Sequence, residues 1–320
     1  MGLFDANCSN APDSAPSDAG IAGTGILLSF MITAVLALLI STSVIWAEVR
    51  GKPSTIRRKV LNGYSDSQIM QGIGIQSVGL ANMSSLIPYH FFLIWMLSLL
   101  SMATHNATLL ALVHDYRRDW VLRWLRQFLM FVNLALSSVS GIFVLRVVSK
   151  GLVHSTLPVA CVWNGEVKGT SGDTGVSFVG TIAVMAANGI IFALATWYLH
   201  SRNQRFFKAI QIIGLLLMAA SAIGVAIRVI YVAQAFGGNT NVKLSDEGEK
   251  SWSFGQSLSM LLLIMPLVSA IEIYRGDMKV APPLEDERQP LYDGELQSGL
   301  EHHRFQPNPF FGSESNLFKK

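Results

Sequence analysis

The chain has 320 residues, of which 51% are hydrophobic and 14% are charged, with a mean hydropathy of +0.41. This composition is too apolar for an ordinary soluble domain of that length, and it indicates an integral membrane protein. The net charge of +3 is small, and nothing in the chain suggests nucleic-acid binding.

The first 20 residues are small and polar, which predicts a flexible leader. A cleavable signal is not expected because no positive charge precedes the first apolar run. That run, residues 21–47, is long enough to cross a bilayer as a helix, for which about 20 apolar residues suffice.

Two further apolar runs between Ser65 and His114 predict a membrane hairpin with its tip near Pro88. On one ideal helix, the polar and small residues of the first run fall within an arc of roughly 140°. They are Gln68, Gln71, Gln76, Gly79 and Asn82. An unpaired polar group in hydrocarbon costs several kcal/mol, so this face should look into the protein or a cavity.

Four more spans are expected at residues 120–148, 176–199, 206–235 and 252–274, which makes seven. The predicted fold is therefore all-α, a polytopic bundle of seven transmembrane helices over residues 21–275. Residues 276–320 are rich in Pro, Glu, Asp, Gln and Ser without apolar periodicity, which predicts a disordered tail.

Lysine and arginine gather in alternate loops, which predicts the orientation of the bundle. The basic loops hold Arg50, Lys52, Arg57, Arg58 and Lys59, then Arg117 and Arg118, then Arg202, Arg205 and Lys208. The other loops hold only Lys150, Lys168, Lys243 and Lys250. We therefore expect the N-terminus outside the cell or in a lumen, and the tail in the cytosol.

The two cysteines, Cys8 and Cys161, both fall on the oxidising side in this topology. A disulfide between them would hold the leader over the bundle, and the alternative is two free thiols. No cysteine pair has metal-type spacing, and we expect neither a metal nor a cofactor.

Acidic residues are scarce near the membrane, and all of them fall close to its cytosolic boundary: Glu48, Asp66, Asp115 and Glu272. The simple interpretation makes Asp66 a helix N-cap and pairs Glu48 and Glu272 with Arg50 or Arg275. The alternative is that one of these acids is buried and has a raised pKa.

The other polar residues at membrane depth predict a cavity among the second, third, sixth and seventh spans. His105 and Asn106 would face its middle, and Tyr89, His90 and Arg228 its outer mouth. The alternatives are an interhelical hydrogen bond for each of the first two residues, and interfacial anchoring for the other three.

Several kinds of chemistry are excluded or made improbable by what the spans lack. No lysine lies in the interior of a span, since Lys208 stands at the edge of residues 206–235, and a retinal Schiff base is therefore excluded. There is also no phosphate-binding loop, no HExxH, no Gly-x-Ser-x-Gly and no pair of DDxxD clusters.

The first 150 residues resemble a large group of multispanning membrane proteins from filamentous fungi. The matching residues are Cys8-x-Asn10, Gly-Ile-Ala-Gly-Thr-Gly at 20–25, Ser65-Asp66-x-Gln68, Gly72-Ile73, Gly79, Tyr89-His90 and Thr104-His105. The chain departs from the pattern early in the first span, where Ile26 or Leu27 stands in place of the group's usual arginine. Beyond residue 150 only the architecture is similar.

In size and topology the chain is also similar to the membrane-bound terpene cyclases of fungal meroterpenoid pathways, of the ascofuranone and macrophorin type. This similarity implies acid-initiated cyclisation of a farnesyl chain on an aromatic ring, with the apolar substrate entering from the bilayer. Glu272 or Asp66 would donate the proton, and His105 would act as the base or orient the acid. Trp95 and Tyr231 would offer aromatic faces to the cation. The endoplasmic reticulum or another endomembrane is the expected location.

The competing hypothesis is a seven-span receptor or sensor without catalytic activity, for which the plasma membrane is the alternative location. A transporter is the third hypothesis. It is disfavoured because no inverted repeat or matching pair of broken spans is visible.

Overall fold

The computed structural model describes residue 6 and residues 8–51, 54–118, 120–164, 175–200, 206–238 and 242–275. The predicted tail, residues 276–320, lies outside these residues. The described part of the chain is helical, with one isolated β-bridge. Its α-helices are α1 (Thr24–Val49), α2 (Thr55–Ala81), α3 (Pro88–Ala111), α4 (Val113–Arg118), α5 (Trp120–Ser149), α6 (Gly175–His200), α7 (Phe207–Val232), α8 (Phe254–Leu261) and α9 (Met265–Tyr274). Short 3-10 turns are η1 (Val159–Trp163), η2 (Gln234–Phe236) and η3 (Gly248–Lys250).

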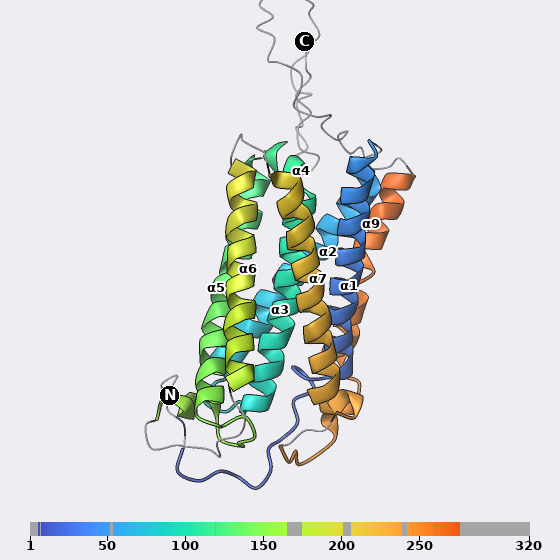
Figure 1. The fold of residues 1–320 in the computed structure, drawn as a ribbon. Helices are drawn as coiled ribbons and strands as arrows, with labels where there is room; N and C mark the ends of the chain where they lie inside the picture. The colour runs from blue at the N-terminus through green and yellow to red at the C-terminus, as the bar shows by residue number, and fades with distance from the viewer. Residues whose placement is uncertain are drawn as a thin grey trace, which may run out of the picture. The chain divides into compact units, whose positions relative to one another are not determined.

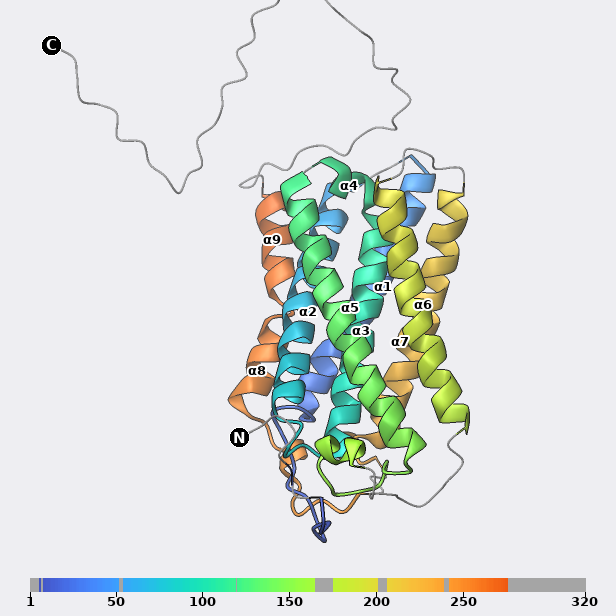
Figure 2. The same ribbon diagram turned by 90° about the vertical axis from the view of Figure 1, so that its left-hand side faces the viewer.

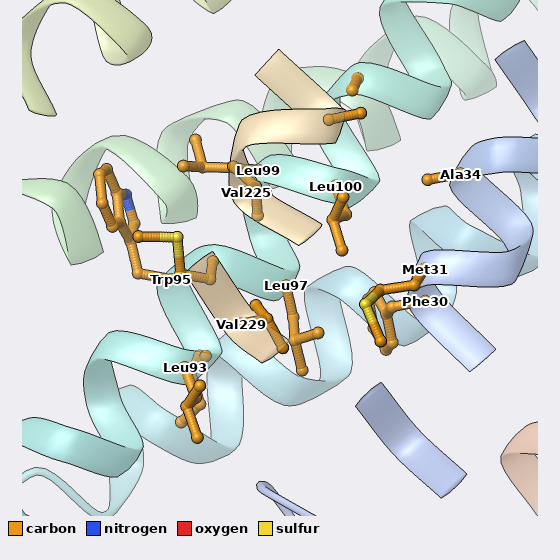
Figure 3. Packing of buried hydrophobic residues seen from close by; sticks show 14 of the residues in the cluster. Phe30, Met31, Ala34, Leu93, Trp95, Leu97, Leu99, Leu100, Val225 and Val229 are labelled. Atoms are coloured by element: carbon orange, nitrogen blue, oxygen red, sulfur yellow. The ribbon is translucent and has the colours of Figure 1, made fainter. Parts of the chain in front are cut away.

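The long helices run side by side as a bundle, and α3 lies at its centre (Figures 1 and 2). It contacts α1, α2, α5, α6 and α7, and every residue in it except Phe92 is buried. Figure 3 shows Leu97 and Leu100 of α3 between α1 and α7, which contribute Phe30 and Val229 among others. The surrounding helices therefore shield α3 from lipid.

Among the described residues, six helical segments are long and apolar enough to cross a membrane: α1, α3, α5, α6, α7 and Gly248–Tyr274, which contains α8 and α9. The outer helices expose large apolar side chains such as Trp197, Leu216 and Ile271. Such side chains are stable in lipid but would be costly in water. The chain is an integral membrane protein. Helix α2 is not among the six because its polar residues lower its hydropathy.

Two elements differ from the sequence prediction. Helix α2 begins at Thr55 rather than near Asp66, so Asp66 lies inside the helix and is not its N-cap. The expected seventh span divides into α8 and α9, with Pro266 in the first turn of α9. Proline has no backbone N–H to continue the hydrogen-bond pattern of the preceding turn. It packs against Gly63 of α2, where a Cβ would lie 3.1 Å from the Cβ of Pro266.

The described part of the leader is held against the bundle, where the sequence predicted a flexible segment. Cys8 and Cys161 form a disulfide with their Cα atoms 5.6 Å apart, which confirms that hypothesis. Ala15 pairs with the loop before η3, since its N–H donates to the carbonyl of Lys243 at 3.1 Å. The Ser17 hydroxyl donates to Asp246 and, with the Gly248 N–H, lowers the pKa of that carboxyl. We call this end of the bundle the leader end, and the opposite one the basic end.

Gly72 permits the close approach of α2 to α3 and α5. A Cβ at this position would lie 2.4 Å from Ser101 Oγ and 2.9 Å from Asn133 Oδ1. We expect Gly72→Ala to lower the free energy of unfolding by about 1–3 kcal/mol, because the neighbours must shift. Gly74→Ala is the matched control, since nothing lies within 4 Å of a Cβ there. It should be neutral or stabilising by up to ~1 kcal/mol through helix propensity.

Detergent unfolding titrations of the two variants and the wild-type protein measure these changes. Equal stability of the two alanine variants would contradict the packing described for α2.

Candidate functional site

A buried carboxylate lies at the leader end, where α3 begins. Glu249 of η3 has no exposed surface, and it is the one buried carboxylate among the described residues. The Tyr89 hydroxyl donates to its Oε2 at 2.8 Å, and His90 Nε2 lies 2.8 Å from its Oε1. Both carboxylate oxygens therefore have a partner on α3.

Local structure explains how this cluster assembles. Pro88 is the first residue of α3, a position that suits proline because the first N–H groups of a helix have no intrahelical partner. Tyr89 and His90 follow in the first turn, where the helix dipole favours a negative charge such as that of Glu249. The Gln234 N–H donates to the Tyr89 oxygen at 2.9 Å, and Thr24 donates to the Glu249 carbonyl at 3.3 Å. The cluster thus joins α1, α3, η2 after the end of α7, and η3.

A second polar group lies near the middle of the bundle. The Ser101 hydroxyl donates to the Gln68 carbonyl at 3.0 Å and lies 2.9 Å from His105 Nε2. Asn133 of α5 donates to the Ser101 oxygen at 3.2 Å and accepts from Gln76 at 2.7 Å. All five residues are buried. Helices α2, α3 and α5 are therefore joined through side-chain hydrogen bonds at membrane depth.

A third group closes the basic end. Arg58 of α2 pairs with Glu48 of α1 and, at 2.7 Å, with Asp115 of α4. Its side chain is 9% exposed, so water screens this group of charges little. One arginine thus ties together the end of α1, the beginning of α2 and the helix that follows α3.

Two further contacts brace α4 and α5 against α2 at this end. Arg126 makes two hydrogen bonds to Asp66, at 3.0 and 2.7 Å. Tyr116 donates to Asn62 at 2.8 Å, and burial raises the pKa of Tyr116, so the phenol keeps its proton for that bond.

The predicted catalytic residues do not come together. Asp66 is paired with Arg126 and its side chain is 45% exposed, while Glu272 lies exposed on α9. His105 is buried on α3 against α2, in the middle group. Their catalytic roles stay predictions, but these three residues do not form one site.

The predicted pocket residues are also dispersed. Asn106 faces away from His105 and donates to Asn188 of α6 at 3.3 Å. Trp95 is buried, with its ring centroid 6.1 Å from that of Phe92. The Arg228 guanidinium lies 5.3 Å from the Phe92 centroid. The remaining member, Tyr231, is 74% exposed. Only Tyr89 and His90 meet around a buried acid.

Sequence reasoning missed Glu249 because it lies in a loop, outside every predicted span. Its neighbours Asp246 and Glu247 are acidic too, and nothing in the local pattern separates the buried residue from the two exposed ones. Only the contact of this loop with α3 identifies it.

No known protein family, curated protein or solved structure is measurably similar to this chain. Within the described residues, no group of three or more His, Cys, Asp or Glu side chains is arranged to hold a metal ion. The functional argument therefore depends on the geometry of the three polar groups.

Glu249→Gln tests the leader-end cluster. The amide removes the negative charge and replaces one acceptor by a donor, so one of the two contacts is lost or His90 must change its tautomer to keep it. We expect the free energy of unfolding to fall by about 1–3 kcal/mol. The control is Glu247→Gln, because Glu247 is exposed and pairs only with Lys250 of its own loop among the described residues. Its effect should stay within about 0.5 kcal/mol. Indistinguishable stabilities of the two variants would contradict the buried cluster.

Proposed function

We propose that this chain is a seven-span receptor or sensor of the membrane, in which α3 couples the leader end to the basic end. Its leader would lie outside the cytosol, and its tail inside. The observation that carries the proposal is that one enclosed helix and its direct continuation, α4, hold charged contacts at both ends of the bundle. Resemblance to the fungal membrane-protein group is compatible with this proposal.

The seventh crossing would be α2. It has 27 residues, about 40 Å at 1.5 Å per residue, which is enough to cross the hydrocarbon core. Its buried polar residues Gln68 and Gln76 face α3 and α5 rather than lipid. Arg50, Arg57, Arg58 and Lys59 at the basic end support a cytosolic position for that end. An endomembrane is our first choice of location, and the plasma membrane is the alternative.

Helix α3 is suited to carry a change from one end to the other. It is about 36 Å long, and α4 follows it after a single residue, Leu112. Its first turn binds Glu249, and Asp115 and Tyr116 of α4 bind α2. Because close-packed interiors deform little, a displacement of the first turn is transmitted along the helix rather than absorbed beside it.

Arg58 supplies the element that would respond. Its guanidinium forms ion pairs with Glu48 of α1 and with Asp115 of α4. If α3 shifts, Asp115 moves relative to Arg58, and this ion pair opens while the one with Glu48 remains. A stimulus that alters the leader-end cluster would thus change the surface at the basic end, where a cytosolic partner would bind.

A second candidate is the terpene cyclase of fungal meroterpenoid pathways, and Glu249 favours it. Acid-initiated cyclisation needs a buried carboxyl close to aromatic groups, and Glu249 beside Tyr89 fits this better than Asp66 or Glu272. Against it, Tyr89 and His90 occupy both oxygens of the carboxylate. Each oxygen is then already held by a partner, and an alkene would have to compete with Tyr89 or His90 for the proton of the acid. An apolar small molecule from the bilayer would be the ligand of a sensor or the substrate of a cyclase.

Hydrogen exchange in lipid nanodiscs tests the coupling. In Glu249→Gln, we expect faster exchange of the backbone amides of residues 112–116 at the basic end. A coupling free energy of about 1–3 kcal/mol corresponds to roughly 5- to 150-fold in rate. Glu247→Gln should leave these amides unchanged. Faster exchange confined to residues 242–250 would contradict a sensor that works through α3.

Membranes from cells that express the chain, supplied with a farnesylated phenol, separate the two candidates. A cyclised product that disappears in Glu249→Gln would establish the cyclase. Absence of product, together with the change at residues 112–116, supports the sensor.

A further inference from the structure

Four buried polar side chains lie within about one helical turn of one another in depth, on the mutually contacting helices α1, α2 and α3. They are Ser41 of α1, Ser65 and Gln68 of α2, and His105 of α3. Each of them is at most 1% exposed. We call this group the three-helix junction.

The contacts of the helices place these residues at a common level. Glu48 and Arg58 pair at the basic end, and Ser41 and Ser65 each lie about two helical turns, or ~10 Å, from that pair. Ser101 then joins α3 to α2, because it contacts both the Gln68 carbonyl and His105. All three pairs of these helices are in contact.

The junction contains an unusual number of polar atoms without a partner. The hydroxyls of Ser41 and Ser65, both amide atoms of Gln68 and Nδ1 of His105 have no hydrogen-bond partner within the protein. Each such atom costs about 1–3 kcal/mol when buried. Lipid offers no compensation, since hydrocarbon neither donates nor accepts hydrogen bonds. Five unpaired polar atoms in one region would destabilise the folded bundle substantially.

The hydrogen bonds around Ser101 determine the tautomer of His105 and so the kind of partner that its Nδ1 requires. The Ser101 hydroxyl donates its proton to the Gln68 carbonyl, so its oxygen accepts from Nε2–H of His105. In the neutral imidazole, Nδ1 is then an acceptor. Only a molecule with a donor can satisfy it, while the Gln68 amide N–H can donate to that molecule's oxygen.

We infer that the three-helix junction binds a neutral hydroxyl group, which donates to His105 Nδ1 and accepts from the Gln68 amide and the Ser41 hydroxyl. The group belongs either to water or to the alcohol of an apolar molecule that enters from the bilayer. A charged ligand does not fit, because none of the four side chains is acidic or permanently basic. Asp66, next to Ser65, is already paired with Arg126. The inference does not depend on the sensor or the cyclase.

Apolar replacements test the site, because a bound hydroxyl and an empty junction predict changes in Tm of opposite sign. If the junction binds a hydroxyl, Ser41→Ala and Gln68→Met each remove one of its contacts and lower Tm by roughly 2–4 °C. If nothing binds, each removes an unpaired polar atom and raises Tm. Ser98→Ala calibrates the loss of a buried hydroxyl that is already satisfied, since Ser98 bonds to Ser137 at 2.9 Å.

The double variant of Ser41 and Gln68 adds a test that does not depend on the sign of either single change. Their polar atoms have no direct bond to each other, so a molecule that both contact would couple their effects. We expect a double change smaller than the sum of the single changes. Additive effects, or a rise in Tm for both single variants, would overturn the proposal.

Two matched probes identify the source of the hydroxyl. Farnesol and farnesyl methyl ether are added to nanodiscs holding the full chain. If the site takes a lipophilic alcohol, farnesol raises the Tm of the wild type but not of Gln68→Met, and the ether, which has no donor, has no effect. If water is the ligand, neither probe shifts Tm while the non-additivity remains. Equal shifts in Tm with both probes, in wild type and in Gln68→Met alike, would show that the probes only partition into lipid. If the effects of the Ser41 and Gln68 variants are also additive, the site is excluded.

Discussion

Hydrocarbon cannot form hydrogen bonds, and the arrangement of α2, α3 and α5 follows from that constraint. Helix α2 has too many polar side chains to face lipid, so Gln68 and Gln76 must be enclosed. Their enclosure requires close neighbours, which Gly72 permits on α2 and which Ser101 and Asn133 provide. Enclosing α2 in this way places α3 at the centre, with the more apolar helices α6 and α7 towards the lipid.

Because α3 is central, contacts at its two ends can link the two surfaces of the bundle. At the leader end its first turn binds Glu249, and the disulfide and the pairing of Ala15 hold the leader over the same region. At the basic end, α4 continues from α3 and places Asp115 against Arg58. A helix that is buried along its length, with a carboxylate bound at its first turn and another on the helix that follows it, is a means of linking two surfaces. This is why we propose a sensor rather than a catalyst.

Much of the fold could be predicted from the sequence, because hydropathy acts over whole segments. The apolar runs become helices, the disulfide forms, and the expected polar face of α2 is buried at Gln68, Gln76 and Gly79, although Asn82 is exposed. The beginning of α2 was missed because residues 55–64 contain the charges that usually end a span. Here Arg58 is tolerated since Glu48 and Asp115 neutralise it.

The candidate site was less predictable, because whether an acid is buried depends on helix rotation and on loop contacts. A helix turned by half a revolution would have enclosed Glu272 rather than exposing it, and hydropathy does not determine that rotation. Glu249 is buried by a loop that folds onto α3, a contact between residues 159 positions apart. Local sequence carries no trace of such a contact.

The central claim is that α2 crosses the membrane with its polar face enclosed, and labelling at its two ends tests this most directly. Single cysteines replace Arg50 and Asn82, which are exposed beside the two ends of the helix. The native cysteines are bonded to each other and do not react. A membrane-impermeant maleimide is applied to sealed cells or, for an endomembrane, to sealed vesicles. We predict that the two positions are labelled from opposite faces of the membrane. Labelling of both from the same face would contradict the crossing of α2, and with it this account of the bundle.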